Sequence, residues 1–340
     1  MASLQPLFRQ GDANVVLNSG ILSQPLTKSK IKKGHALPPQ LFSHNSQAGE
    51  WFKGAVGMNN PYGWAGRMMD VLETTGEIEP SFSLGRESAW LRGQQVQQNV
   101  VKIGKVTKLR MLDKNKNTRS SFVRMNDKKS LSPFHEYFSD VRGQALVKSD
   151  LLANHLSVIS DSASLTSIGS LGAQLNTVLK LIKLSSNFEH KRQVYFVRLK
   201  GFDTHDNQLE RHPVLLKELS DTVSTFYAEL ELLGAQSQVT TFTMSDFGRR
   251  IAANGQGSDH GWGSHQLLFG GALNAKKAIG VFPDIRLKGE DDMGVGRIIP
   301  SLSNEQVGAT LAKWMGVSEK GMSYVFPNLR NFAVHDLHFF

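Results

Sequence analysis

The segment from Val194 to Met244 limits the fold of this chain more than any other part of the sequence. The unbroken apolar run at 194–197 is typical of a strand that is buried on both faces. Apolar residues then recur at steps of four or three, which predicts a helix over about 213–233: Leu215, Leu219, Val223, Phe226, Leu230 and Leu233. Gly234 is well placed to end this helix, and a second strand is predicted at 239–245. A strand–helix–strand unit predicts that the two strands lie parallel in one sheet, with the helix packed across them.

Carboxylate and imidazole side chains follow these predicted strands, at positions where each strand gives way to a loop. Such side chains are common ligands of zinc and manganese, and open α/β sheets place their sites at the carboxyl ends of strands. We therefore expect six residues to converge in one metal-binding pocket: Asp203, His205, Asp246, Asp259, His260 and His265.

The six candidates differ in how specific their local patterns are. Asp203 and His205 are two residues apart, so in an extended chain they face the same side. They could bind one ion or could order their loop by hydrogen bonds. Asp259 and His260, with His265 five residues further on and glycines between them, form the most specific local pattern. A glycine-rich loop of this kind can fold closely around an ion.

Asp246 and the two arginines that follow it allow more than one interpretation. Asp246 ends its strand and is either a metal ligand or a turn residue. Arg249 and Arg250 could bind an anionic group through paired N–H donors, or they could neutralise nearby acids. We favour the neutralising role for Arg250.

Other periodic segments complete a single predicted domain that spans residues 1–340. Helices are expected over 61–72, within 132–182 and after Ser303, where Gln306 completes a possible capping box. No apolar run reaches the length of about 18 residues that a transmembrane helix needs, and the first residues do not read as a signal peptide. The chain contains no cysteine, which excludes disulfides and thiol chemistry but is compatible with either cytosol or periplasm.

Positive charge is concentrated within the stretch 80–130, which we expect to be an excursion of short strands and loops. Residues 102–129 contain ten lysines and arginines against two aspartates, in a chain of net charge +9. Such a patch can attract anions, nucleic acid or anionic lipid, although a solvated surface is the simpler interpretation. Aromatic residues are not interleaved with the charges, so we do not expect nucleic acid as a partner.

Three motifs carry a resemblance to a known family: GFDTHDNQ at 201–208, SDFGRR at 245–250 and the DHGWGSH that ends at residue 265. Together with LFSHNSQAGEWF at 41–52, they resemble the DUF1501 family of the sulfatase and alkaline-phosphatase-like superfamily. The resemblance covers nearly the whole chain. It implies an α/β fold with a central, mostly parallel sheet and helices on both faces.

The resemblance also implies a function, which is hydrolysis of a small anionic phosphate or sulfate ester at divalent metal ions such as zinc, manganese or calcium. The six residues above would be the pool of ligands for two ions. Ser43 would be the nucleophile, with Ser46 as the second candidate, and Arg249 would steady the anion. The alternative is a non-catalytic binding or assembly protein that keeps the fold.

The sequence departs from the family pattern at two places. Family members usually begin with a strand and a glycine-rich turn that carries Asp or Asn, whereas Asp12 precedes its strand here. We therefore expect the chain to lack the family's first strand and to have weak or no esterase activity as written. Phe247 stands where many relatives carry a histidine. The family resemblance suggests export to the periplasm, if a signal precedes this sequence.

Overall fold

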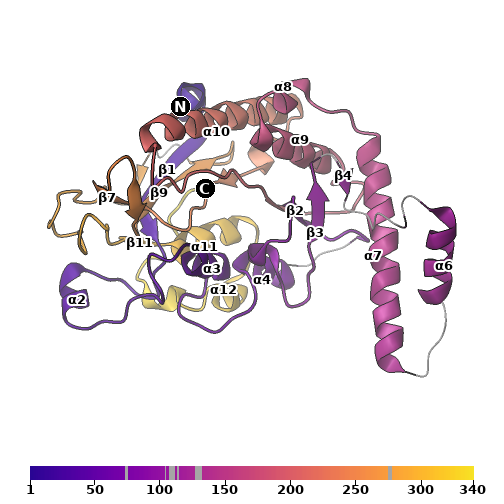
Figure 1. Cartoon of the computed structure of the whole chain (residues 1–340), viewed down its shortest axis with the longest axis horizontal. Coiled ribbons are helices and arrows are strands. Elements are labelled where there is room, and N and C mark those ends of the chain that lie inside the picture. The colour runs from indigo at the N-terminus through magenta and orange to yellow at the C-terminus, as the bar shows by residue number, and fades with distance from the viewer. Residues whose placement is uncertain (73–75, 104, 107–111, 113–114, 127–131, 275–277) are drawn as a thin grey trace.

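The structure is a computed structural model that describes the whole chain except residues 73–75, 104, 107–111, 113–114, 127–131 and 275–277. Its described strands form two larger sheets and a two-stranded hairpin, and helices surround them in a mixed α/β architecture (Figure 1). The strands are β1 (Ala13–Gly20), β2 (Ser81–Leu84), β3 (Asn99–Lys102), β4 (Lys105–Val106), β5 (Val194–Phe196), β6 (Thr241–Phe242), β7 (Arg249–Ala253), β8 (Ser258–His260), β9 (Ser264–Phe269), β10 (Ala278–Ile279) and β11 (Leu302–Ser303). The helices are α1 (Gln5–Gln10), α2 (Lys28–Lys32), α3 (His44–Lys53), α4 (Trp64–Val71), α6 (Lys116–Asn126), α7 (Pro133–Ser157), α8 (Ala163–Thr166), α9 (Ser170–Lys183), α10 (Gln208–Leu232), α11 (Asn304–Trp314) and α12 (Glu319–Val325).

Strand β1 lies in the middle of the five-stranded sheet, which has the order β10–β1–β9–β6, with β11 also paired to β1. Strands β10 and β11 run parallel to β1, whereas β9 runs antiparallel to both β1 and β6. The sheet is therefore mixed. Asp12 comes immediately before β1, as expected, and accepts a hydrogen bond from Gln236. The expectation that an earlier strand of the family is missing stays a prediction.

The two strands predicted to be parallel neighbours belong to different sheets, so this prediction is wrong. Strand β5 pairs in parallel with β2 in a second sheet of order β4–β3–β2–β5, while β6 is in the first sheet. Both strands are also shorter than the predicted ranges of 194–199 and 239–245.

Side chains supply a physical reason for this separation, because they bind the backbone groups that a neighbouring strand would otherwise use. The amide of Gln174 on α9 accepts from the backbone N–H of Arg198 at 2.9 Å and donates to its carbonyl at 2.9 Å. The hydroxyl of Tyr227 on α10 accepts from the N–H of Thr241 at 3.1 Å. Backbone groups near the ends of β5 and β6 are thus satisfied without pairing between these strands.

Helices cover both faces of the two sheets, because successive strand residues point to opposite sides. On one side, Ala13, Phe269 and Phe82 join a core with α9 and α10. On the other side, Val16 and Leu268 join a core with α4, α11 and α12. Each core contains residues of both sheets, so the sheets share their helical layers.

The predicted helices are largely confirmed, with different limits. Helix α10 begins at Gln208, earlier than expected, and Gly234 follows its end with φ 65°. Helix α4 is shorter than the predicted range, and Ser303 with Gln306 forms the expected capping box of α11.

The stretch 80–130 differs from the expected excursion of strands and loops. Strands β2 and β3 form the interior of the second sheet, so this part of the stretch belongs to the body of the protein. The later part contains the helix α6, which pairs with α7 at the edge of the molecule (Figure 1). Within the part of the chain that the structure describes, no helix is both long and apolar enough to cross a membrane.

Candidate metal centre

Two segments that are far apart in the sequence meet at the candidate site. Asp203 and His205 lie in the loop between β5 and α10, and His260 ends strand β8 of the β7–β8 hairpin. Gly257 permits this approach, since a Cβ atom there would lie 2.4 Å from the carbonyl carbon of His205. A side chain at this position would push the hairpin away from the loop.

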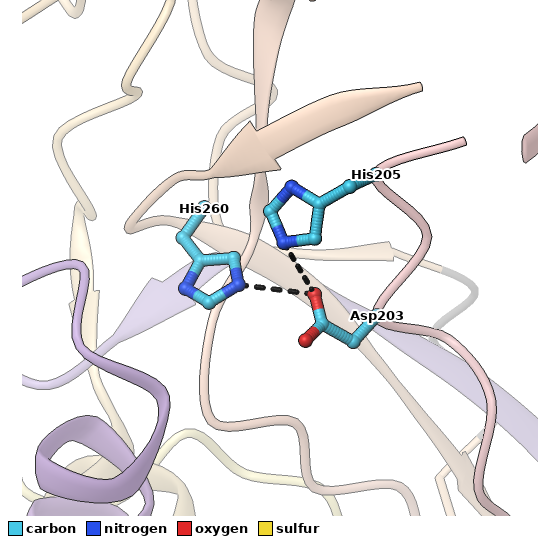
Figure 2. Close-up of side chains that lie close together, drawn as sticks. All are labelled: Asp203, His205 and His260. Carbon is cyan, nitrogen blue, oxygen red and sulfur yellow. Dashed lines mark hydrogen bonds and ion pairs between the residues drawn. The ribbon is translucent and has the colours of Figure 1, made fainter. Parts of the chain in front are cut away.

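Asp203, His205 and His260 form a cluster of potential metal ligands (Figure 2). The Nε2 atom of His205 lies 3.1 Å from Oδ1 of Asp203, and the Nε2 atom of His260 lies 3.0 Å from the same oxygen. One ligand atom from each residue can be chosen so that all lie within 4.8 Å of one another. This part of the predicted pocket is therefore assembled.

The other nitrogen of each histidine ring has its own partner. The Nδ1 atom of His205 lies 3.3 Å from Oδ1 of Asp259, and Nδ1 of His260 lies 3.0 Å from the carbonyl oxygen of Phe42. A carbonyl oxygen can only accept, so Nδ1 of His260 carries a hydrogen. Metal-binding histidines usually donate this second N–H to a carboxylate or a carbonyl, which orients the ring. Both rings here have such partners.

The charges around the cluster favour ionised carboxylates. Partial burial raises the pKa of Asp203, but the hydrogen bond from His260 and the charges of His260, His205 and Arg249 outweigh it, so the pKa falls below its ordinary value. Ionised carboxylate is the form that binds a cation.

Asp259, a predicted ligand, lies behind His205 and outside the cluster of three. Arg250 pairs with Oδ2 of Asp259 at 2.8 Å, and the amide of Asn254 donates to Oδ1 at 2.5 Å. Desolvation raises the pKa of Asp259, but the bond from Asn254 and the charge of Arg250 lower it overall. The contact of Arg250 agrees with the neutralising role that we favoured for it.

Arg249 is held by backbone groups beneath the cluster. Its Nη2 donates to the carbonyl of Phe202 at 2.7 Å and to Oδ1 of Asp203 at 3.2 Å, and its Nη1 donates to the carbonyl of Ser258 at 2.5 Å. The guanidinium therefore joins the Asp203 loop to β8. In this position it braces the site, and binding an anion would require it to give up some of these bonds.

Asp246 is close to the cluster but has a different partner. Its Oδ2 contacts Nδ1 of His44, the first residue of α3, and the ring centre of His44 lies 6.4 Å from that of His260. Burial raises the pKa of Asp246, although the charge of His44 opposes this. His44 was not among the residues predicted for the site. Its position directly after the candidate nucleophile Ser43 is the sequence feature that could have identified it as a site residue.

His265 is a predicted ligand that does not belong to the cluster of three, and its place in a common pocket stays a prediction. Its Nδ1 accepts from the backbone N–H of Asn18 at 3.2 Å, and its ring stacks on Phe282 with centres 5.4 Å apart. His265 is on β9, which pairs with β1, whereas His260 is on β8 of the β7–β8 hairpin. Burial lowers the pKa of His265.

Ser43 is the residue before α3, its side chain is exposed, and the carbonyl of the preceding residue contacts His260. It makes no side-chain capping bond to the helix. The preceding residue, Phe42, has φ 73°, a left-handed conformation that is uncommon for a large side chain. This conformation accompanies the contact of its carbonyl with His260. The second candidate, Ser46, contacts the side chain of Gln40 instead.

Phe247 fixes the orientation of the His260 ring from the other side. The two rings stack with centres 3.9 Å apart and planes 14° apart. Phe247 therefore supplies a packing contact to the ring of His260.

An open depression of about 420 Å³ runs beside α3. Its described lining includes Gln40, Ser46, Glu50, Lys53 and Tyr62, and it does not include the three clustered ligands. Asp203 and His205 are instead exposed at the surface, so the candidate metal centre is open to solvent.

The fold and the site define a mixed α/β protein with an exposed aspartate–histidine–histidine cluster. The model of the DUF1501 family, described as a protein of unknown function, matches residues 7–326. The match covers nearly the whole chain, which therefore belongs to the DUF1501 family. Strand β1 lies inside the matched region. No curated protein matches the chain.

Proposed function

We propose that this chain is a metal-dependent hydrolase of phosphate or sulfate esters, with a fold related to that of alkaline phosphatases and sulfatases. The observation that carries the proposal is the convergence of two histidine Nε2 atoms on one oxygen of Asp203. The partners of both Nδ1 atoms support it further. A bound ion would take the place of the hydrogens on the two Nε2 atoms, while the Nδ1 partners would keep the rings in position.

The chemistry of the donors favours some ions over others. One carboxylate with two imidazoles suits zinc or manganese, whereas calcium prefers oxygen ligands. Asp203, His205 and His260 would hold the ion, with Asp259 and Phe42 orienting the rings. When bound, such an ion would polarise an ester oxygen. Asp246 and His44 are the adjacent pair that a second ion could use.

The contact between His260 and the carbonyl of Phe42 supports a role for the next residue, Ser43, and for the start of α3. Ser43 precedes the first turn of α3, where unpaired backbone N–H groups and the helix dipole favour an anion. An anionic ester bound between the cluster and α3 would present its phosphorus or sulfur atom to Oγ of Ser43. The His44–Asp246 contact would hold this end of α3 in place.

The alternative function is a non-catalytic binding or assembly protein that keeps one ion. The commitment of Arg249 to backbone carbonyls favours it, because a hydrolase needs a free group to stabilise the charge of its transition state. Both proposed functions require the bound ion, but only the hydrolase would convert an ester to products.

Metal binding should be measured first, by titrating zinc into purified metal-free chain in a calorimeter. We expect saturable zinc binding by the wild type and by His335→Ala, which removes an exposed histidine outside the cluster. We expect at least about a tenfold weaker affinity for His260→Ala. Equal affinities of the three proteins would refute the site. Hydrolysis of aryl phosphate and aryl sulfate esters is then measured with the zinc-loaded protein. Turnover would support the hydrolase, and zinc binding without turnover would support the binding protein.

A further inference from the structure

Two arginines follow neighbouring parallel strands of the second sheet. Strands β2 and β5 pair in parallel with Ser83 opposite Phe196, and Arg86 and Arg198 come shortly after these two partners in the sequence. Parallel strands end at the same edge of a sheet, so both arginines lie at the carboxyl edge of this sheet. The loop that carries Asp203 begins at the same edge, because it follows β5. Open α/β sheets bind their ligands outside the carboxyl ends of the strands.

Hydrogen bonds hold the backbone of each arginine in place. The hydroxyl of Ser83 donates to the carbonyl of Arg86 at 2.6 Å. The amide of Gln174 accepts from the N–H of Arg198 and donates to its carbonyl, both at 2.9 Å. The guanidinium of Arg198 lies over the ring of Phe196, with Cζ 5.6 Å from the ring centre. Arg198 is therefore positioned before a ligand binds, which lowers the cost of ordering its side chain.

Neither guanidinium forms a hydrogen bond or an ion pair with a carboxylate among the residues that the structure describes. Glu87 is next to Arg86 in the sequence, but it pairs with Arg92 at 2.8 Å. Arg86 is exposed, whereas Arg198 is partly buried. A charged group that is removed from water usually has a partner of opposite charge, so the unpaired state of Arg198 needs an explanation.

The charged neighbours of Arg198 indicate what kind of partner is missing. Burial lowers the pKa of Arg198, the positive charge of Arg86 lowers it further, and the negative charge of Asp246 raises it. Asp246 itself contacts His44. An anion bound between the two arginines would relieve their repulsion and would supply the missing partner.

The open depression beside α3 is connected with this edge through two of its lining residues. The ring of Phe52 packs against Phe196, with centres 5.7 Å apart. Ala89, which also lines the depression, follows Arg86 closely in the sequence. The depression thus offers space for the organic part of an ester whose anionic group the arginines hold.

We propose that Arg86 and Arg198 bind the anionic group of a phosphate or sulfate ester. A guanidinium binds such oxyanions through paired N–H donors. A tetrahedral anion has enough oxygen atoms for two guanidinium groups, whereas a carboxylate has only two oxygens. The part of this site in a reaction rests on the proposed function, where it would supply the free positive charge that Arg249 does not. Binding of the anion itself does not depend on turnover.

The test is calorimetric titration of the full chain with phenyl phosphate, in the presence of a chelator that removes divalent ions. We expect saturable binding by the wild type. Arg198→Gln and Arg86→Gln should each bind at least about tenfold more weakly, because each loses a charge-assisted pair of hydrogen bonds. Arg9→Gln is the matched control, since it removes the charge of an exposed arginine on α1, and it should bind as the wild type does.

Two comparisons test the chemistry of the site. Benzoate, which carries a carboxylate on the same ring, should bind the wild type at least about tenfold more weakly than phenyl phosphate. Arg198→Lys should recover part of the affinity that Arg198→Gln loses, because lysine keeps the charge without the paired donors. Circular dichroism checks the fold of each variant. Arg86→Gln keeps the test decisive if Arg198→Gln does not fold, since the side chain of Arg86 is exposed.

The proposal would be overturned if the wild type does not bind phenyl phosphate, or if Arg86→Gln and Arg198→Gln bind it as the wild type does. Equal affinity for benzoate would also overturn it. These outcomes are separate from those of the proposed function. Arginine-dependent binding without ester turnover by the zinc-loaded chain would support the anion site and contradict the hydrolase. Turnover with an unchanged KM in both arginine variants would contradict the anion site and support the hydrolase.

Discussion

The Nδ1 atom of His260 lies 3.0 Å from the carbonyl oxygen of Phe42, and this contact joins strand β8 to the residue before Ser43. It connects the candidate metal centre to the candidate nucleophile through a single peptide unit. A change in the position of His260 would therefore also move the start of α3. Metal binding and the placement of Ser43 should depend on each other.

Asp259 should tune the metal affinity without providing a ligand. Asp259→Asn keeps the size of the side chain but replaces a charged acceptor of the His205 N–H with a weaker one. We expect about a tenfold loss of zinc affinity in calorimetry, with binding still saturable. The control is Asp206→Asn, which changes an exposed aspartate next to His205. Asp206 pairs with Arg211 and not with His205. Equal affinities of the two variants would show that Asp259 does not orient His205.

Ser43 should be required for turnover and not for metal binding. If the loaded chain hydrolyses aryl phosphate or sulfate esters, Ser43→Ala should abolish this activity and leave the zinc content unchanged, because the hydroxyl is not among the clustered ligands. Ser46→Ala, which removes a hydroxyl directed at Gln40, should retain turnover. Activity that survives in both variants would place the attacking group elsewhere.

Gly257 should be needed for the close approach of the hairpin and the loop. In Gly257→Ala, the new Cβ would meet the carbonyl group of His205, so the free energy of unfolding should fall by roughly 1–3 kcal/mol. Zinc affinity should fall as well. In Gly143→Ala, on helix α7, the Cβ meets nothing within 4 Å, and stability should rise by up to about 1 kcal/mol. Urea unfolding measures both variants, and an unaffected Gly257→Ala would contradict the close contact.

Glu305 should make the stability of the protein depend on pH. Burial raises its pKa from 4.5 to about 7, against hydrogen bonds from Asn328 and Val56 that lower it. Since the folded pKa lies above the unfolded value, the stability that this group contributes is fully present below 4.5 and is lost as the pH rises through about 7.

Glu305→Gln provides the comparison, because glutamine does not titrate. Between about pH 5 and about pH 8, the wild type should lose roughly 2–3 kcal/mol of unfolding free energy relative to this variant. Exposed Glu319 supplies the control, since Glu319→Gln should follow the wild type at both pH values. A constant difference between the wild type and Glu305→Gln would contradict the raised pKa.

The sequence by itself determined the features that depend only on residues a few positions apart, such as the face of a helix or its cap. The periodic apolar side chains of 215–233 identify α10, because residues three or four apart share a face of any helix. Ser303 and Gln306 identify a helix start for the same local reason, and the structure contains both features. The residue types of Asp203, His205 and His260 predict metal ligands, and the structure brings these three side chains together.

The tertiary structure alone decided which of these residues meet. His265 follows His260 by five residues, yet it is on β9, which pairs with β1, and it does not belong to the cluster of three. His44 contacts Asp246, which lies about two hundred residues further along the chain. The side-chain amide of Gln174 forms hydrogen bonds with the backbone N–H and carbonyl of Arg198, just after β5. These contacts depend on side chains that are distant in the sequence and on strand pairings that compete for the same backbone groups. The spacing of residues along the sequence does not show which strand or side chain will bind a given backbone group.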